Sequence, residues 1–134
     1  MKKRGRKRKK DPHLLCILES EEKKDFQLKG KLWIEGKEGT FLGCGRIALL
    51  EKIKELGSIS KAAKSMNMSY KHAWDLINSM NRQAKTHLVE TKIGGKKGGG
   101  THLTEAGEKA IQQFKEIYRE FQEFLNKTVK KLDL

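Results

Sequence analysis

Two short helices joined by a very short turn constrain this chain more than any other feature. Ser58 is a good N-cap for the first helix, and small inward-facing residues such as Ala62 let a neighbouring helix approach closely. Asn67 suits the turn, because asparagine tolerates a positive φ angle. Ser69 then caps a second helix. We therefore predict a helix-turn-helix over residues 58–86.

The flanking segments extend this motif on both sides. An apolar stripe predicts a preceding helix over residues 46–56, and Gly57 follows it as a C-terminal cap. After the motif, strands at 88–93 and 101–103 enclose a loop of five glycines and two lysines at 94–100. Such a loop lets the backbone approach a phosphate or a minor groove closely. It therefore predicts a wing over residues 88–103.

The N-terminal third shows the period-two pattern of a β-strand. Phe26, Leu28, Leu32 and Ile34 share one face, and a turn signal follows at residues 36–39. The pattern predicts a β-hairpin over residues 26–43.

The C-terminal segment is predicted to be one long helix over residues 104–132. Its apolar positions are spaced by steps of four, three, four, three and four, which is the spacing of a coiled-coil seam. A seam this long and aromatic exceeds what one small domain can cover, so we interpret it as a homodimer interface. The predicted interface residues are Phe114, Ile117, Phe121 and Phe124.

The charge of the chain points to an anionic partner. The formal net charge is +13 over 134 residues, and eight of the basic side chains lie within residues 1–10. We expect residues 1–11 to be a disordered basic tail, because like charges repel and nothing apolar is available to bury. The tail is predicted to contact a minor groove or flanking phosphates. Residues 12–134 then form one domain.

Several functional classes find no support. The histidines show no metal-ligand spacing, and no recognisable motif places a catalytic set, so we expect no enzyme activity, cofactor or metal. The glycine loop lacks a Walker ending and leads into a strand, which argues against a nucleotide site. No apolar run or signal peptide points to a membrane. We expect a cytoplasmic protein, with Cys16 and Cys44 as reduced, ordinary small apolar residues.

Together these elements predict an α+β, mainly helical fold. It is a winged helix-turn-helix with an N-terminal β-hairpin and a long C-terminal dimerisation helix. In such folds the side chains of the first two turns of the second motif helix reach base edges in the major groove. The predicted contacts to double-stranded DNA are Ser58, Ser60, Lys61, Ser69, Tyr70, Lys71, His72, Asp75, Lys96 and Lys97.

The residue types allow alternative roles at several of these positions. Lys71 donates to guanine O6 or N7, and Tyr70 contacts a thymine methyl group or a phosphate. Asp75 either accepts from cytosine N4 or orients Lys71 across one helical turn. Trp74 either wedges under the preceding helix or lies against the sugar–phosphate backbone.

Five segments of this chain resemble the N-terminal DNA-binding domain of the ModE family, the molybdate-responsive regulators with a LysR-type helix-turn-helix. They are residues 57–63 (GSISKAA), 69–75 (SYKHAWD), 80–81 (MN), 94–100 (GGKKGGG) and 103–107 (LTEAG). The resemblance covers about residues 26–125 and implies a winged helix-turn-helix, a homodimer and operator binding. The family's molybdate-binding domain of small β-barrels has no counterpart within these 134 residues. We therefore expect this chain to lack a molybdate sensor of its own, and a separate effector-sensing partner stays open.

Three functional hypotheses follow. The leading one is a dimeric, sequence-specific transcription regulator that binds a pseudo-palindrome with half-sites about 34–36 Å apart. The second is an architectural DNA-binding protein without sequence preference, which the basic tail favours. The third is an adaptor that uses the long aromatic helix to bind a sensor protein.

Overall fold

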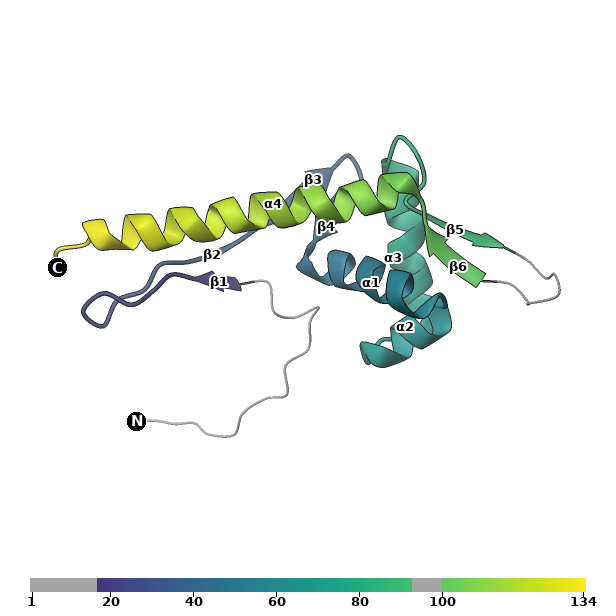
Figure 1. The fold of residues 1–134 in the computed structure, drawn as a ribbon, viewed down its shortest axis with the longest axis horizontal. Helices are drawn as coiled ribbons and strands as arrows, with labels where there is room; N and C mark the ends of the chain where they lie inside the picture. Colours follow the sequence, from purple (N-terminus) through teal and green to yellow (C-terminus); the bar gives the residue numbers. More distant parts are fainter. Residues whose placement is uncertain (1–16, 93–99) are drawn as a thin grey trace.

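A computed structural model describes residues 17–92 and 100–134. Helix α4 (Glu105–Thr128) runs along the length of the molecule, as Figure 1 shows. Three shorter helices and a strand pair gather at its N-terminal end. A second strand pair lies beside its C-terminal half.

The helix-turn-helix forms as its capping residues predict. Helix α1 (Cys44–Leu56) ends at Gly57, which has a φ of 67° and donates its N–H to the carbonyl of Ile53. Helix α2 (Ile59–Ser65) and helix α3 (Tyr70–Gln83) begin after Ser58 and Ser69, whose hydroxyl oxygens each accept a backbone N–H three residues later. The turn between them contains Asn67 with a φ of 55°. The predicted motif is therefore confirmed.

One apolar core holds the three helices against the first half of α4. Its central side chains are fully buried because the apolar stripes of all four helices converge there. They include Leu49, Leu50, Ile53, Ala62, Ala73, Ile77, Met80 and Phe114.

The wing is a two-stranded antiparallel sheet of β5 (Val89–Lys92) and β6 (Gly100–Leu103). Asn81 of α3 joins it to the helix. Its side-chain oxygen accepts from the N–H groups of Leu88 and Val89, and its amide nitrogen donates to the carbonyl of Val89. The predicted wing tip, including Lys96 and Lys97, lies outside the described residues.

The N-terminal hairpin is shorter than the sequence predicts. Strand β3 (Trp33–Gly36) turns at residues 36–39 into β4 (Gly39–Gly43), where Gly39 has a φ of 102°. The preceding strand, β2 (Lys29–Lys31), pairs instead with β1 (Ile17–Glu19) in a separate sheet. The alternating pattern continues unbroken from one strand to the next, and alternation alone does not record a change of partner.

A narrow arm extends from this domain. We define the arm as residues 17–31 and 119–131, and the winged domain as the described residues between 32 and 118. Three buried side chains form the arm's small apolar centre: Leu18, Leu125 and Val129. Polar contacts surround it. Gln122 donates to the carbonyl of Glu19, and the ammonium of Lys23 donates to carbonyls of Lys130 and Leu132 beyond the end of α4.

The C-terminal helix begins and ends close to its predicted bounds. Thr104 caps it by accepting the N–H of Gly107 at 3.1 Å. After Thr128 the chain tightens into a 3₁₀ turn, Val129–Lys131, so the predicted end near residue 132 is confirmed to within one residue.

Candidate nucleic-acid interface

Helix α3 presents its most exposed side away from the core. Lys71 and Asp75 lie one turn apart on this side, and their side chains are 85% and 58% exposed. The Lys71 ammonium donates to the Asp75 carboxylate at 3.0 Å. The contact matches the predicted role of Asp75 in orienting Lys71.

A second side of α3 faces the wing and the start of α2. Trp74 packs partly buried against the core, and its ring meets the exposed ring of Tyr70 edge-on at 6.3 Å between centroids. The packing favours the wedging alternative for Trp74. The two rings border a shallow cleft of about 330 Å³ that also includes Ser58, Ser60 and Lys92.

The start of α2 contributes polar groups to this same cleft. The hydroxyl oxygen of Ser58 accepts the N–H of Lys61 at 3.1 Å, so its lone pair serves as the helix cap. Ser60 and Lys61 are exposed. Ser58 and Ser60 therefore lie beside Tyr70 and the wing strands, whereas Lys61 lies outside the cleft.

The third side of α3 faces the hairpin. His72 and Leu76 border a cleft beside Trp33. One and two turns further on, Arg46 donates from Nη1 to Ser79 Oγ at 3.0 Å, and Gln83 donates to the carbonyl of Thr40. His72 was predicted together with Lys71 and Asp75, but it lies on a different flank of the helix. It is exposed and lies at the edge of the candidate interface.

Sequence reasoning missed one basic residue beside the predicted site. Lys92 ends strand β5 and lines the cleft between α2, α3 and the wing. Its position next to the glycine loop was the available signal. Lys96 and Lys97, which the sequence places in that loop, lie outside the described residues.

The four predicted dimer residues differ in accessibility. Phe114 is 2% exposed because it packs in the core of its own chain. Phe121 is half-buried over Gly30. Ile117 and Phe124 are exposed, the latter by 56%. The accessible part of the seam therefore lies in the C-terminal half of α4, at Ile117 and Phe124.

The structure also bears on the expectations about cysteines, metal ions and membrane spans. Cys44 is disulfide-bonded, which contradicts the expected reduced state, and Cys16 lies outside the described residues. Across the described residues, no group of three His, Cys, Asp or Glu side chains is placed to hold a metal ion. None of the described helices is long and apolar enough to span a membrane.

A family model matches the central segment of the chain. The family model described as "Bacterial regulatory helix-turn-helix protein, lysR family" matches residues 45–108. Residues 45–108 are therefore similar to the LysR-type helix-turn-helix. The match runs from the start of α1 through the wing into the first turn of α4, so all the elements around the candidate interface lie within it.

Curated relatives confirm the resemblance to ModE. The chain is 55% identical over 69 residues to "Transcriptional regulator ModE" of Yersinia pestis, which covers 52% of this chain and 26% of that protein. It is 42% identical over 95 residues to "Molybdenum transport protein ModE" of Azotobacter vinelandii, covering 71% of this chain and 35% of the relative. The chain thus spans about a quarter to a third of the length of these relatives.

Among solved structures, a mutant of S. aureus MepR bound to an oligodeoxyribonucleotide matches with a TM-score of 0.47 and 19% identity. The match covers 66% of this chain and 62% of that one. This similarity is too distant to support an argument about function.

Proposed function

We propose that this chain is a DNA-binding transcription regulator that places the exposed side of α3 in the major groove of double-stranded DNA. The observation that carries the proposal is the pairing of Lys71 with Asp75 at the exposed start of α3, within the LysR-type segment. The ModE relative from Yersinia pestis is named a transcriptional regulator, which supports the same assignment.

The paired side chains supply complementary hydrogen-bonding groups. An ammonium donates to O6 or N7 of guanine, and a carboxylate accepts from N4 of cytosine. Because Asp75 holds Lys71 across one helical turn, the ammonium is directed before DNA arrives. The Lys71 side chain therefore loses less conformational freedom when it meets a base edge.

The surrounding groups serve orientation rather than base selection. Ser60 and Lys61 lie at the start of α2, and Lys92 of the wing lines the same cleft as Ser60. Hydroxyls and ammonium groups in such positions contact phosphates. Tyr70 projects between them and the exposed side of α3, where it meets a thymine methyl group or a phosphate.

The first experiment compares duplex binding of Lys71→Ala with that of the wild type. Selection of bound duplexes from a random pool provides the preferred sequence. We expect the substitution to weaken specific binding by about 1–3 kcal/mol and to relax preference at one position. The measurement is a titration of selected and scrambled duplexes at fixed salt.

Lys127→Ala is the matched control, because it removes the same charge from the arm at an exposed position. It should leave the sequence preference unchanged. Equal losses for the two variants would contradict the base-reading role of Lys71. A pool that returns no enriched sequence would favour the architectural alternative instead.

We further propose that the protein acts as a homodimer joined through the outer seam of α4. Ile117 and Phe124 are exposed apolar side chains on one helix, and the rings of Phe121 and Phe124 stack with centroids 6.4 Å apart. Burying such surface against a second copy is favourable, and aromatic side chains are enriched in interfaces. A two-fold dimer fits a pseudo-palindromic operator.

The dimer proposal is tested by Phe124→Ser. We expect sedimentation to show a shift from dimer to monomer, with weaker binding to a two-half-site duplex and little change for a single half-site. Glu120→Ser, another exposed position on α4, is the control. A wild-type protein that sediments as a monomer at tens of micromolar would contradict the proposal, and binding to a separate protein would then point to the adaptor alternative.

A further inference from the structure

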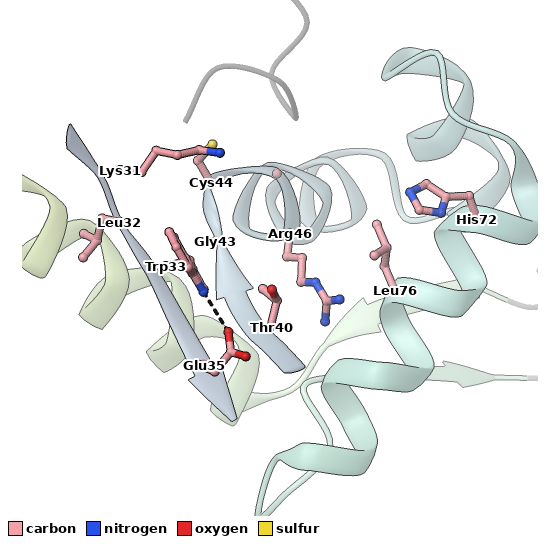
Figure 2. Close-up of a pocket in the computed structure, with 11 residues that line it drawn as sticks. Lys31, Leu32, Trp33, Glu35, Thr40, Gly43, Cys44, Arg46, His72 and Leu76 are labelled. Atoms are coloured by element: carbon pink, nitrogen blue, oxygen red, sulfur yellow. Dashed lines mark hydrogen bonds between the residues drawn. The ribbon is translucent and has the colours of Figure 1, made fainter. Parts of the chain in front are cut away.

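A cleft on the hairpin side of α3 has no role in the proposed DNA contact. It measures about 630 Å³, within the size range of small-molecule sites. Figure 2 shows its side chains arriving from several elements, among them Trp33 from β3, Arg46 from α1 and His72 from α3.

Much of the cleft wall is apolar. Trp33 is 51% exposed, and Leu32 and Leu76 lie on either side of the space. The indole N–H of Trp33 donates to Glu35 at 2.8 Å, so the polar edge of the ring is already satisfied. The ring face therefore offers a surface on which an apolar or aromatic group can stack.

The opposite wall carries positive charge. Arg46 is half-buried, and the loss of solvent lowers the pKa of its guanidinium. In the described part of the chain it donates to the neutral hydroxyl of Ser79, not to a carboxylate. A guanidinium has five N–H donors in a fork that matches an oxyanion, so donors remain for a ligand. Lys31 and His72 lie along the same cleft.

We propose that this cleft binds a small organic oxyanion, a carboxylate or phosphate monoester attached to an aromatic or aliphatic body. The oxyanion accepts from Arg46, and the body stacks on Trp33 between the two leucines. A phosphodiester of duplex DNA matches this site poorly, because the bases attached to it are stacked inside the duplex and are not free to fill the space. Glu35 lies beside Trp33 in Figure 2 and directs the negative group away from that end, toward Arg46.

Occupancy of the cleft bears directly on α3. The Arg46 guanidinium bonds to Ser79 on the third turn of α3, and His72 lies in its first turn. A ligand that attracts Arg46 weakens its bond to the helix and contacts the flank beside Lys71. We therefore infer that the ligand changes duplex affinity, a step that rests on the proposed function.

Direct binding is tested on the full chain without DNA. Calorimetric titration with phenyl phosphate should show saturable binding, with inorganic phosphate and benzyl alcohol each weaker by about tenfold or more. Arg46→Gln and Trp33→Leu should each weaken phenyl phosphate by about tenfold. Lys52→Gln, on α1 but outside the cleft, should not. Absence of saturation by about 10 mM phenyl phosphate would overturn the site.

Using both Arg46→Gln and Trp33→Leu means that the test does not depend on one variant folding correctly. Trp33 is exposed, so Trp33→Leu removes the stacking surface even if Arg46→Gln perturbs folding. Equal affinity for phenyl phosphate in Trp33→Leu and the wild type would contradict the proposed stacking.

The effect on DNA is measured separately. Duplex affinity is compared with and without saturating phenyl phosphate, with inorganic phosphate matching the ionic strength. We expect a change of about fivefold or more, and the same factor in ligand affinity when duplex is present. Ligand binding with unchanged duplex affinity would overturn the coupling. A protein that binds ligand but no duplex would contradict the proposed function and leave the site standing.

Discussion

The winged domain and the arm are built with very different amounts of buried surface. The domain joins four helices and a hairpin around one continuous core, in which side chains such as Leu50 and Ile53 are fully buried. The arm has two short strands against one half-helix, and its apolar centre is Leu18, Leu125 and Val129. Exposed hydrogen bonds to the backbone add to this small apolar centre. Asn126 accepts the N–H of Glu21, and Gln122 donates to the carbonyl of Glu19.

This contrast separates two kinds of stability. Residues with many buried neighbours unfold only with the whole domain, whereas thinly packed elements open locally at lower cost. The position of α3 relative to the wing is therefore fixed by the domain. The arm, with fewer buried side chains, is the part that we expect to open at the lower cost.

Removing a buried side chain from each region should give the largest difference. We expect Ile53→Ala to cost about 2–5 kcal/mol of unfolding free energy, because the surrounding helices close the cavity only partly. Leu125→Ala should lower the global unfolding free energy much less, since the arm can open without the domain. Urea denaturation measures the first effect, and hydrogen exchange in β1 and β2 measures the second. Equal global losses would contradict the comparison.

Adding a methyl group tests how rigid each region is. A Cβ at Gly107 would overlap the backbone carbonyl oxygen of Leu88, whereas one at Gly30 would approach the far end of the Phe121 ring, at 2.8 Å. The backbone at Leu88 can move aside less easily than the side-chain ring of Phe121. We expect Gly107→Ala to cost about 2–3 kcal/mol and Gly30→Ala to cost less than about 1 kcal/mol. Thermal unfolding followed by circular dichroism measures both, and a costlier Gly30→Ala would show that the arm is the tighter region.

Two asparagines provide the smallest of the three contrasts. Asn81→Ala leaves the N–H groups of the buried Leu88 and Val89 without their partner, at a cost of about 1–2 kcal/mol. Asn126→Ala removes an exposed bond to the N–H of Glu21, which water replaces, so we expect less than about 0.5 kcal/mol. Chemical denaturation of the two variants beside the wild type is the measurement. A comparable loss at Asn126 would mean that the arm's polar contacts are shielded from solvent.

The winged domain was largely predictable because its signals are local. Caps at Ser58, Ser69 and Thr104 and the cap glycine Gly57 act on their own neighbours in the chain. Each of the predicted helices begins and ends within a few residues of these signals.

The arm was missed because its partners are far apart in sequence. Strand β1 pairs with β2 and packs on α4, about 100 residues away in the sequence. The apolar run around Leu18 is too short to predict this packing. The disulfide of Cys44 was likewise not indicated by spacing.

The sequence predicted the exposure of Lys71 and Asp75 better than the direction in which neighbouring side chains of α3 face. Lys71 and Asp75 share the exposed side of α3 as expected, but His72 turns toward the hairpin. Which flank a helical residue faces depends on where neighbouring elements dock. The hairpin docks on that flank through Gln83, which donates to the carbonyl of Thr40, and Arg46 of α1 bonds to Ser79 on the same flank. No local sequence pattern specifies either contact. Phe114 illustrates the same point. Its place in the apolar seam of α4 is compatible both with packing inside its own chain and with contact to a second subunit, and the structure buries it in the core.

The unbroken course of α4 makes it a rigid lever between the arm and the proposed DNA-binding surface. Its 24 residues span about 36 Å at the usual helical rise. A tilt of roughly 5° at the arm therefore displaces the other end by about 3 Å, close to the ~3.4 Å rise between successive base pairs. In a dimer joined through the arm, the angle between two copies of α4 would set which half-site spacing the pair of recognition helices can straddle.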